Sequence, residues 1–238
     1  RAKLDCPSQP LSRTVRAMSE FTLYIGNRAY SSWSLRGWLA CKLAGIAFTE
    51  KAHDMAAADW PEFVRTASPT GKVPVLRHGK IVVWESIAIG DYLADLFPKA
   101  GLWPEDPAAR AQARAISAEM HAGFTALRSS MWMNTRRRFP GKGRNPGSLA
   151  NVARIVALWE ETRSRFGAGG PYLFGVRPTL ADAMYAPVVS RFVTWEPELP
   201  ATAKAYVAAV WEHPFMVEWR KAAEAEPWTI AKYENPGA

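Results

Sequence analysis

The chain has 238 residues, 48% of them apolar and 11 of them tryptophan, and its 30 Lys and Arg outnumber its 22 Asp and Glu. This length and apolar content suit one large or two small packed domains and exclude a chain disordered throughout. No run of about 18 residues is apolar without a charge, which argues against a membrane partner. Two cysteines, Cys6 and Cys41, are too few for a disulfide framework or a four-ligand zinc site. We therefore expect a cytoplasmic protein without a metal.

The positive charge is concentrated in two short segments. Residues 1–17 carry a net charge of +3 and residues 136–144 carry +5, so the remainder of the chain is neutral. A nucleic-acid-binding protein is expected to spread basic residues over one face, with aromatic residues between them. The distribution argues against a nucleic-acid partner. We expect the basic run to be a solvated loop, with attraction of anionic substrates as the alternative.

Residues 1–18 are the first segment in chain order. They show no apolar periodicity and lack the apolar stretch of a secretory signal. Met18 directly precedes the first strand-like run. We expect a disordered N-terminal extension, with an Arg-rich transit peptide as the alternative.

Strand-like and helix-like runs alternate over residues 20–97. The pattern predicts strands at 21–26, 46–52, 73–77 and 80–84 and helices at 33–44, 60–65 and 86–96. The first half of this order can form a right-handed βαβ unit, and the second half a hairpin followed by a helix. We therefore expect an α/β domain with a mixed four-stranded sheet.

The pattern changes after residue 97. The segment P-K-A-G-L-W-P-E-D-P contains three prolines, which interrupt any helix and predict a linker over 98–106. An all-α domain is expected over 107–227, and residues 228–238 are expected to be a C-terminal tail. The predicted helices are 107–135, 148–166, 180–193, 200–211 and 214–224.

The segment S-P-T-G-K-V-P-V-L (68–76) places Pro74 where a strand begins. Proline cannot donate to a strand ladder, and only bonds to proline adopt the cis form cheaply. A cis bond after Val73 would turn the N–H and C=O of Val73 outward, where they could pair with an extended peptide ligand. A trans proline on an edge strand fits the segment equally well.

Two helix beginnings follow predicted strands. Glu85-Ser86 opens a helix where free N–H groups and the helix dipole suit a carboxylate. Ser31 and Ser32 stand near the start of helix 33–44, where a hydroxyl and the dipole can lower the pKa of a bound thiol from its reference value of about 8.5. An ordinary N-cap is the alternative at both places.

These elements, which would meet at one edge of the sheet, together resemble the glutathione S-transferase superfamily over residues 20–227, and its serine-type zeta and theta-like bacterial members in particular. In R-P-T-L-A-D-A-M-Y-A-P (177–187), Thr179 and Asp182 resemble the family's capping box and are expected to serve folding. The resemblance implies a thioredoxin-like N-terminal domain followed by a C-terminal helical bundle.

The resemblance implies glutathione as a co-substrate and suggests which residues bind it. The backbone of Val73, held by Pro74, would pair with the cysteinyl unit. Glu85 and Ser86 would hold the γ-glutamyl end, and Lys72 would reach the glycine carboxylate.

The resemblance also implies a serine that stabilises the glutathione thiolate. Ser32 matches the theta-like serine and Ser31 the first serine of the zeta pattern, and we slightly prefer Ser32. Tyr24 and Tyr30 are the tyrosine-type alternative.

Trp33 departs from the family pattern, because zeta and bacterial beta members carry a cysteine there. This disfavours mixed-disulfide chemistry and puts a zeta-type isomerisation in doubt. Cys41 falls within a predicted helix and is expected to be a small buried apolar group.

The electrophile is expected to bind between the domains, against helices 107–135 and 148–166. Methionine and aromatic side chains suit varied apolar substrates, and the first of these helices contains Met120, Phe124, Met131, Trp132 and Met133.

The sequence thus predicts a glutathione-dependent transferase, a homodimer, that attacks a small, largely apolar electrophile. The alternatives are a non-catalytic binding module of the same fold, or a glutathione-dependent isomerase, lyase or dehalogenase.

Overall fold

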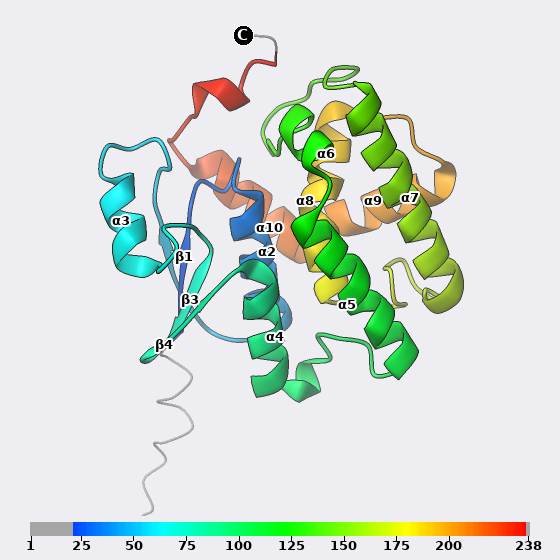
Figure 1. Cartoon of the computed structure of the whole chain (residues 1–238), viewed down its shortest axis with the longest axis horizontal. Coiled ribbons are helices and arrows are strands. Elements are labelled where there is room, and N and C mark those ends of the chain that lie inside the picture. Colours follow the sequence, from blue (N-terminus) through cyan, green and yellow to red (C-terminus); the bar gives the residue numbers. More distant parts are fainter. Residues whose placement is uncertain (1–20, 237–238) are drawn as a thin grey trace, which may run out of the picture.

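The computed structural model describes residues 21–236, and the extension expected over residues 1–18 lies outside them. Within the described residues, a half built on a β-sheet is followed by a half built of helices (Figure 1). This arrangement confirms the fold class expected from the sequence. No helix among residues 21–236 is long and apolar enough to cross a membrane.

The sheet has four strands in the order β2-β1-β3-β4. They are β1 (Phe21–Ile25), β2 (Thr49–Ala52), β3 (Val75–His78) and β4 (Ile81–Trp84). β2 is parallel to β1, whereas β3 is antiparallel to both β1 and β4. The predicted mixed sheet is therefore confirmed, although the second and third strands begin later than expected.

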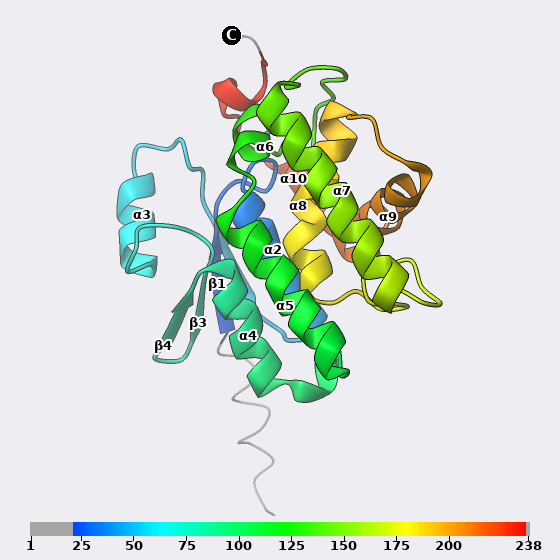
Figure 2. The same ribbon diagram turned by 45° about the vertical axis from the view of Figure 1, so that its right-hand side comes forward.

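Helices cover both faces of the sheet. α2 (Ser32–Leu43) and α4 (Ser86–Leu96) lie on one face and α3 (Trp60–Ala67) lies on the other (Figure 2). Successive strand residues point to opposite faces, so Leu23 packs into the core under α2 and α4, whereas Tyr24 packs with Phe63 of α3.

The helical half contains six helices among the described residues. They are α5 (Pro107–Ala122), α6 (Thr125–Ser130), α7 (Pro146–Phe166), α8 (Leu180–Trp195), α9 (Ala201–Trp211) and α10 (Pro214–Ala225). Short 3₁₀ turns follow α4 at Pro98–Ala100 and α10 at Ala231–Tyr233. Almost every residue of α8 is buried.

The expected helix over 107–135 is wrong, because the chain forms two helices there and then leaves helical geometry. α5 ends at Gly123, whose N–H donates to Glu119 O at 2.8 Å, and Phe124 adopts a left-handed φ of 58°. α6 then stops at Ser130, so residues 131–145 are free to pack as a loop.

The capping box at the start of α8 is confirmed. The Thr179 N–H donates to Asp182 Oδ2 at 2.8 Å. Asp182 is buried, and its Oδ1 also accepts from Leu173 N–H at 3.1 Å and from Tyr206 O–H at 3.0 Å. One carboxylate therefore joins α8 to the preceding loop and to α9.

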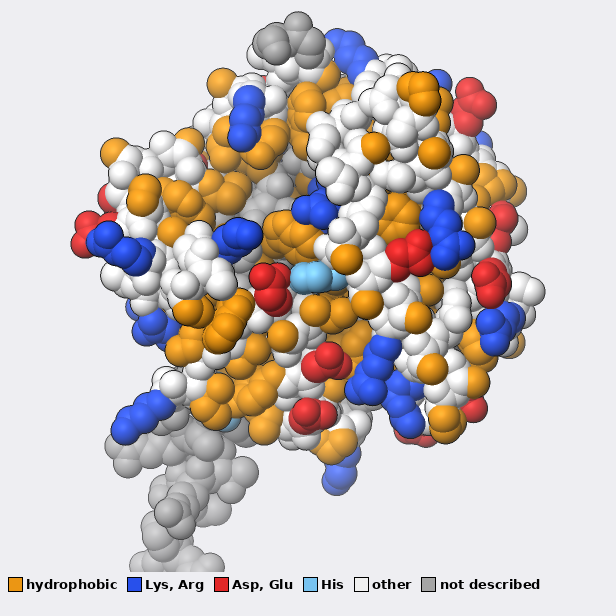
Figure 3. Space-filling view, viewed as in Figure 1, with side chains coloured by type: hydrophobic (Ala, Val, Ile, Leu, Met, Phe, Trp, Pro, Cys, Tyr) orange, Lys and Arg blue, Asp and Glu red, His pale blue; other side chains and the backbone are white. Residues whose placement is uncertain are grey.

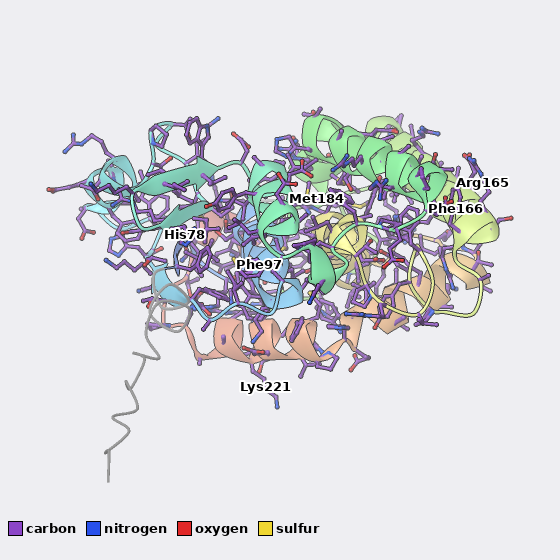
Figure 4. The ribbon with its side chains drawn as sticks, turned by 90° about the horizontal axis from the view of Figure 1, so that it is seen from below. His78, Phe97, Arg165, Phe166, Met184 and Lys221 are labelled. Carbon is purple, nitrogen blue, oxygen red and sulfur yellow. The ribbon has the colours of Figure 1, made fainter. Side chains whose placement is uncertain are left out.

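The two halves meet along α2 and α8. Arg36 of α2 donates from Nε to Met184 O of α8 at 2.8 Å. Figure 4 places Met184 in the middle of the molecule, between the sheet half and the helical half. The interface is thus held by a buried polar contact as well as by apolar packing.

Candidate active site

A first cavity of about 380 Å³ lies at the edge of the sheet. Its lining residues include Ser31, Lys72, Val73, Pro74, Glu85 and Ser86. The sequence elements expected to meet therefore do meet, with Ser32 as the exception. Figure 3 shows this face hollowed, with Lys and Arg side chains around the hollow.

The Val73–Pro74 peptide bond is cis, the arrangement that the family resemblance implies. Val73 lies just before β3, and no backbone hydrogen bond within residues 21–236 uses its N–H or C=O. Gly37 of α2 lets the helix approach closely, because a Cβ at this position would lie 2.8 Å from the Pro74 ring.

Glu85 and Ser86 begin α4 at the wall of the first cavity. Glu85 has a φ of 67°, in the left-handed region, and its Oε2 lies 3.3 Å from His121 Nε2 of α5. The Ser86 hydroxyl is buried, and its one hydrogen-bonding partner among the described residues is the Met184 sulfur at 4.0 Å. The first N–H groups of a helix lack intrahelical partners, so this wall suits a carboxylate.

Ser31 is the N-cap of α2 and belongs to a chain of hydrogen bonds. Gly26 N–H donates to Ser34 Oγ at 3.0 Å, and Ser34 Oγ lies 2.7 Å from Ser31 Oγ. Ser31 Oγ also accepts from Ser34 N–H at 3.3 Å. If the Ser34 hydroxyl donates to Ser31, both lone pairs of Ser31 are occupied, and its own proton is free to point into the cavity.

A second cavity, of about 550 Å³, adjoins the first. Its lining residues include Ser31, Ser32, Arg128, Trp132, Arg191 and Tyr233. Ser31 lines both cavities, whereas Ser32 lines only the second. The geometry therefore favours Ser31 over Ser32 as the hydroxyl nearest to a ligand in the first cavity.

Trp33 stands between the two cavities and lines both. The guanidinium groups of Arg36 and Arg128 lie 4.4 and 4.8 Å from the centre of its ring. His121 meets the ring edge-on at 5.1 Å. The indole therefore forms a rigid wall, held by cations, at the position where zeta members carry a cysteine.

The residues around the second cavity differ from those expected. Met120, Phe124 and Met131 are core residues and do not line it, although Trp132 and Met133 do. α7 contributes no residue to its lining. The walls come instead from α6, from α8 through Arg191, and from residues near the end of the described chain.

The last of these walls is the C-terminal segment, residues 228–236. Tyr233 O accepts hydrogen bonds from Trp132 Nε1 and Asn134 Nδ2, each at 2.9 Å. Glu234 accepts from Tyr30 O–H at 2.7 Å and from Arg137 Nε at 2.6 Å. Sequence reasoning gave this segment no part in the site.

The basic run at 136–144 is not simply a solvated loop. Arg136 is half-buried and donates to Trp228 O at 2.9 Å, to Glu226 O at 2.7 Å and to Ala223 O. Arg137 pairs with Glu234. These two arginines therefore bind the segment that follows α10.

Glu234→Ala is expected to loosen the C-terminal segment. Burial alone would raise the pKa of Glu234, but hydrogen bonds from Tyr30, Arg137 and Asn134 lower it overall. Removing the carboxylate is expected to cost about 1–2 kcal/mol of local opening free energy. Faster hydrogen exchange over residues 228–236 would show this, with Glu224→Ala, an exposed carboxylate of α10, as the control.

The same loosening is expected in the unmodified protein in acid. Because the folded pKa of Glu234 is below its ordinary value, its stabilisation is present at neutral pH and is lost as pH falls through the lowered pKa. Exchange over residues 228–236 that does not depend on pH, after correction for the intrinsic rate, would contradict this.

Neither tyrosine fits the tyrosine-type alternative. Tyr24 lines neither cavity. Tyr30 lines the second, but burial and its hydrogen bond to Glu234 raise its pKa, which disfavours ionisation. Cys41 is buried, as expected, and burial raises the pKa of its thiol. Among residues 21–236, no group of three His, Cys, Asp or Glu side chains is arranged to hold a metal ion.

In the sheet half, two helix beginnings and a cis-proline line one cavity, and an all-helical half follows. This arrangement defines the class of two-domain proteins with a thioredoxin-like first domain. Two family models match the two halves separately. The model for the glutathione S-transferase N-terminal domain matches residues 30–96, and the model for the C-terminal domain matches residues 108–225. The chain belongs to the glutathione S-transferase family.

Three known proteins illustrate the relationship. A probable maleylacetoacetate isomerase of Caenorhabditis elegans is 28% identical over 168 residues, which cover 70% of this chain and 76% of that protein. A glutathione transferase homologue from Burkholderia with bound glutathione superposes with a TM-score of 0.65 at 22% identity, covering 87% of this chain and 99% of its own. A holo bacterial zeta-class maleyl pyruvate isomerase superposes with a TM-score of 0.66 at 22% identity, and the match covers 88% of this chain and 100% of that one. The two structural likenesses show the fold.

Proposed function

We propose that this protein binds glutathione in the first cavity and activates its thiol as a thiolate for attack on a small electrophile in the second. The observation that carries the proposal is the position of Ser31, which lines both cavities and ends a hydrogen-bond chain from Gly26 through Ser34. A hydroxyl at a helix N-terminus stabilises a thiolate by hydrogen bonding and by the helix dipole.

The charges of the first cavity suit a zwitterionic tripeptide. In this proposal the unpaired backbone of Val73, beside Pro74, binds the cysteinyl unit. Glu85 receives the γ-glutamyl ammonium, and Ser86 with the free N–H groups of α4 receives the adjoining carboxylate. Lys72 reaches the glycine carboxylate.

The proposed reaction is thioether formation. The thiolate sulfur donates its electron pair to an electrophilic carbon, and a C–S bond forms. In a substitution the leaving group departs with the bonding pair, whereas in an addition the adjacent carbon takes up a proton. Ser31 remains a hydrogen-bond donor throughout and is not itself the nucleophile.

A glutathione-dependent isomerisation is the second candidate. The relative from Caenorhabditis elegans carries the name maleylacetoacetate isomerase, and the match covers 70% of this chain. In such a reaction the thiolate adds and later leaves, so glutathione is regenerated rather than consumed. Trp33, in place of the zeta cysteine, is the feature of this chain that argues against it.

We also propose that the protein is a cytoplasmic homodimer, as the family resemblance implies. Ile81 and Trp84 of the edge strand β4 are exposed large apolar side chains. They are available to a second copy.

Two measurements test the proposed function. The protein should be retained on immobilised glutathione and eluted by free glutathione, and thiol should be consumed when it is mixed with glutathione and a panel of electrophiles. Retention without turnover of any electrophile would support a non-catalytic module. Turnover of a maleyl diketo acid without net thiol loss would support the isomerase, and absence of retention would refute glutathione binding.

A further inference from the structure

The two cavities differ in charge. The first is lined by Lys72, Arg128 and Glu85, so it contains both signs. The second is lined by Arg128, Arg191 and Lys232, and no Asp or Glu among residues 21–236 lines it. Glu234, the carboxylate of the adjoining C-terminal segment, is already bound by Tyr30, Asn134 and Arg137. The second cavity is therefore cationic.

Arg191 is the most unusual of these cations. It lies on α8 with 3% of its surface exposed. Its Nη1 donates to Pro187 O at 3.0 Å, and its Nε is buried without a hydrogen-bond partner among the described residues. No carboxylate of the described chain forms a salt bridge with it. A buried charge without a partner is costly to a fold.

Two further arginines increase this cost. Arg36 is buried with both Nη1 and Nη2 unpartnered among residues 21–236. Burial, together with Arg191 and Arg128, lowers the pKa of Arg36 well below its ordinary value. Burial and Arg128 also lower the pKa of Arg191, to about 9, which leaves it protonated at neutral pH. Arg128, Arg191 and Lys232 thus line a cavity to which no carboxylate of residues 21–236 contributes, whereas Arg36 contacts Trp33 without lining the cavity itself.

The remaining walls of the second cavity are apolar or neutral. Trp33, Trp132, Met133 and Tyr233 offer aromatic and thioether surface beside the arginines. Such surface accommodates a small carbon skeleton. A ligand that fits both features has an apolar body and an anionic end.

We propose that the second substrate carries a carboxylate, which is bound in the second cavity by Arg191 with Arg128 as the accompanying cation. This inference rests on the proposed function and names its electrophile class: a small carboxylic acid rather than a neutral apolar molecule. A carboxylate accepts two parallel hydrogen bonds from a guanidinium, a geometry that a lysine cannot reproduce. Binding supplies a negative charge to the cavity that Arg128, Arg191 and Lys232 line.

The test compares two electrophiles of similar size that differ in charge, iodoacetate and iodoacetamide. Each alkylates glutathione: the C–S bond forms, the C–I bond breaks and iodide leaves with the bonding pair. We expect kcat/KM, taken relative to the uncatalysed rate of each reagent, to favour iodoacetate at least tenfold. Arg191→Met should reduce this preference at least tenfold, and Arg191→Lys should restore only part of it.

The matched control is Arg165→Met, because Arg165 lies at the far end of α7, remote from the sheet half (Figure 4). The ratio of its normalised kcat/KM for iodoacetate to that for iodoacetamide, here called the preference ratio, should equal that of the unmodified protein. Retained circular dichroism and melting temperature would show that each variant folds.

A binding measurement keeps the test decisive if Arg191→Met does not fold. Succinate should bind the unmodified protein with a Kd at least tenfold lower than that of succinamide. The binding is measured by the quenching of tryptophan fluorescence, to which Trp33 and Trp132 in the cavity wall contribute. Equal binding of the two, or equal preference ratios in folded Arg191→Met and the unmodified protein, would overturn the carboxylate inference while leaving glutathione conjugation standing. Turnover of neither iodo reagent would instead count against the proposed function, and succinate binding would still decide the charge of the cavity.

Discussion

Replacing Ser31 with alanine is expected to lower kcat for glutathione conjugation by about 10- to 100-fold while glutathione still binds. When the Ser34 hydroxyl donates to Ser31, the Ser31 proton is the one donor of the Gly26–Ser34–Ser31 chain left for a ligand. A hydrogen bond to a charged group contributes about 1.5–3 kcal/mol. If the thiolate loses this hydrogen bond, the lost energy corresponds to the expected 10- to 100-fold fall in kcat. The measurement is steady-state conjugation together with glutathione affinity.

Ser32→Ala is the matched control. Ser32 is adjacent and nearly as buried, but it lines only the second cavity, so its loss should change kcat less than threefold. A large loss in Ser32→Ala with none in Ser31→Ala would reverse the assignment and restore the preference drawn from the sequence.

The pH profile gives a readout that a merely structural role would not change. The thiolate is the reactive form, so kcat/KM should rise with pH through the pKa of the bound thiol. The unmodified protein should hold this pKa below the reference of about 8.5. Ser31→Ala removes a donor to the charged form and should move the inflection to higher pH. An inflection that does not move would contradict thiolate stabilisation by Ser31.

Asp182→Ala is expected to destabilise the fold by about 3–5 kcal/mol. The carboxylate is buried and accepts from Leu173 N–H, from Thr179 N–H and O–H, and from Tyr206 O–H. Burial raises the pKa of Asp182, whereas these hydrogen bonds oppose the shift. Alanine leaves the buried donors without an acceptor.

Urea unfolding measures this effect, with the free energy of unfolding compared between variants. Glu224→Ala removes an exposed carboxylate that forms no salt bridge or hydrogen bond among residues 21–236, and should change stability by less than about 0.5 kcal/mol. A similarly small change in Asp182→Ala would mean that water replaces the lost acceptor.

The features predicted correctly from the sequence are those written in short segments. The strands, the Glu-Ser helix start and the Thr179–Asp182 capping box each depend on residues within a few positions of one another. Such signals are visible in a single sequence because the residues that interact lie within the same turn or the same strand. The segment around Pro74 left cis and trans equally open, and only the family resemblance favoured the cis form that the structure has.

The features that were missed depend on contacts between distant residues. Arg191 of α8 and Arg128 of α6 reach one cavity only because the helices pack as they do. Arg191 reads as one polar residue in an apolar helix and gives no local signal. The break at Gly123 is the exception, because a glycine within a helical pattern is a local signal for a helix end.

Ser34 was also overlooked, although it is close in sequence to the serines that were chosen. Its importance comes from Gly26, eight residues earlier, whose N–H donates to Ser34 Oγ and so joins Ser34 to the hydrogen-bond chain. Helical periodicity places Ser34 three residues after Ser31 without indicating that the two hydroxyls touch.

The C-terminal segment has a consequence for where this protein can be shortened. The C-terminal family model ends at residue 225, yet Lys232 and Tyr233 form part of the second cavity. A chain cut at that domain boundary would keep α5 to α10 but would lose the wall that Lys232 and Tyr233 give to the second cavity. Such a truncation should therefore change what the second cavity binds while every helix from α5 to α10 remains in place.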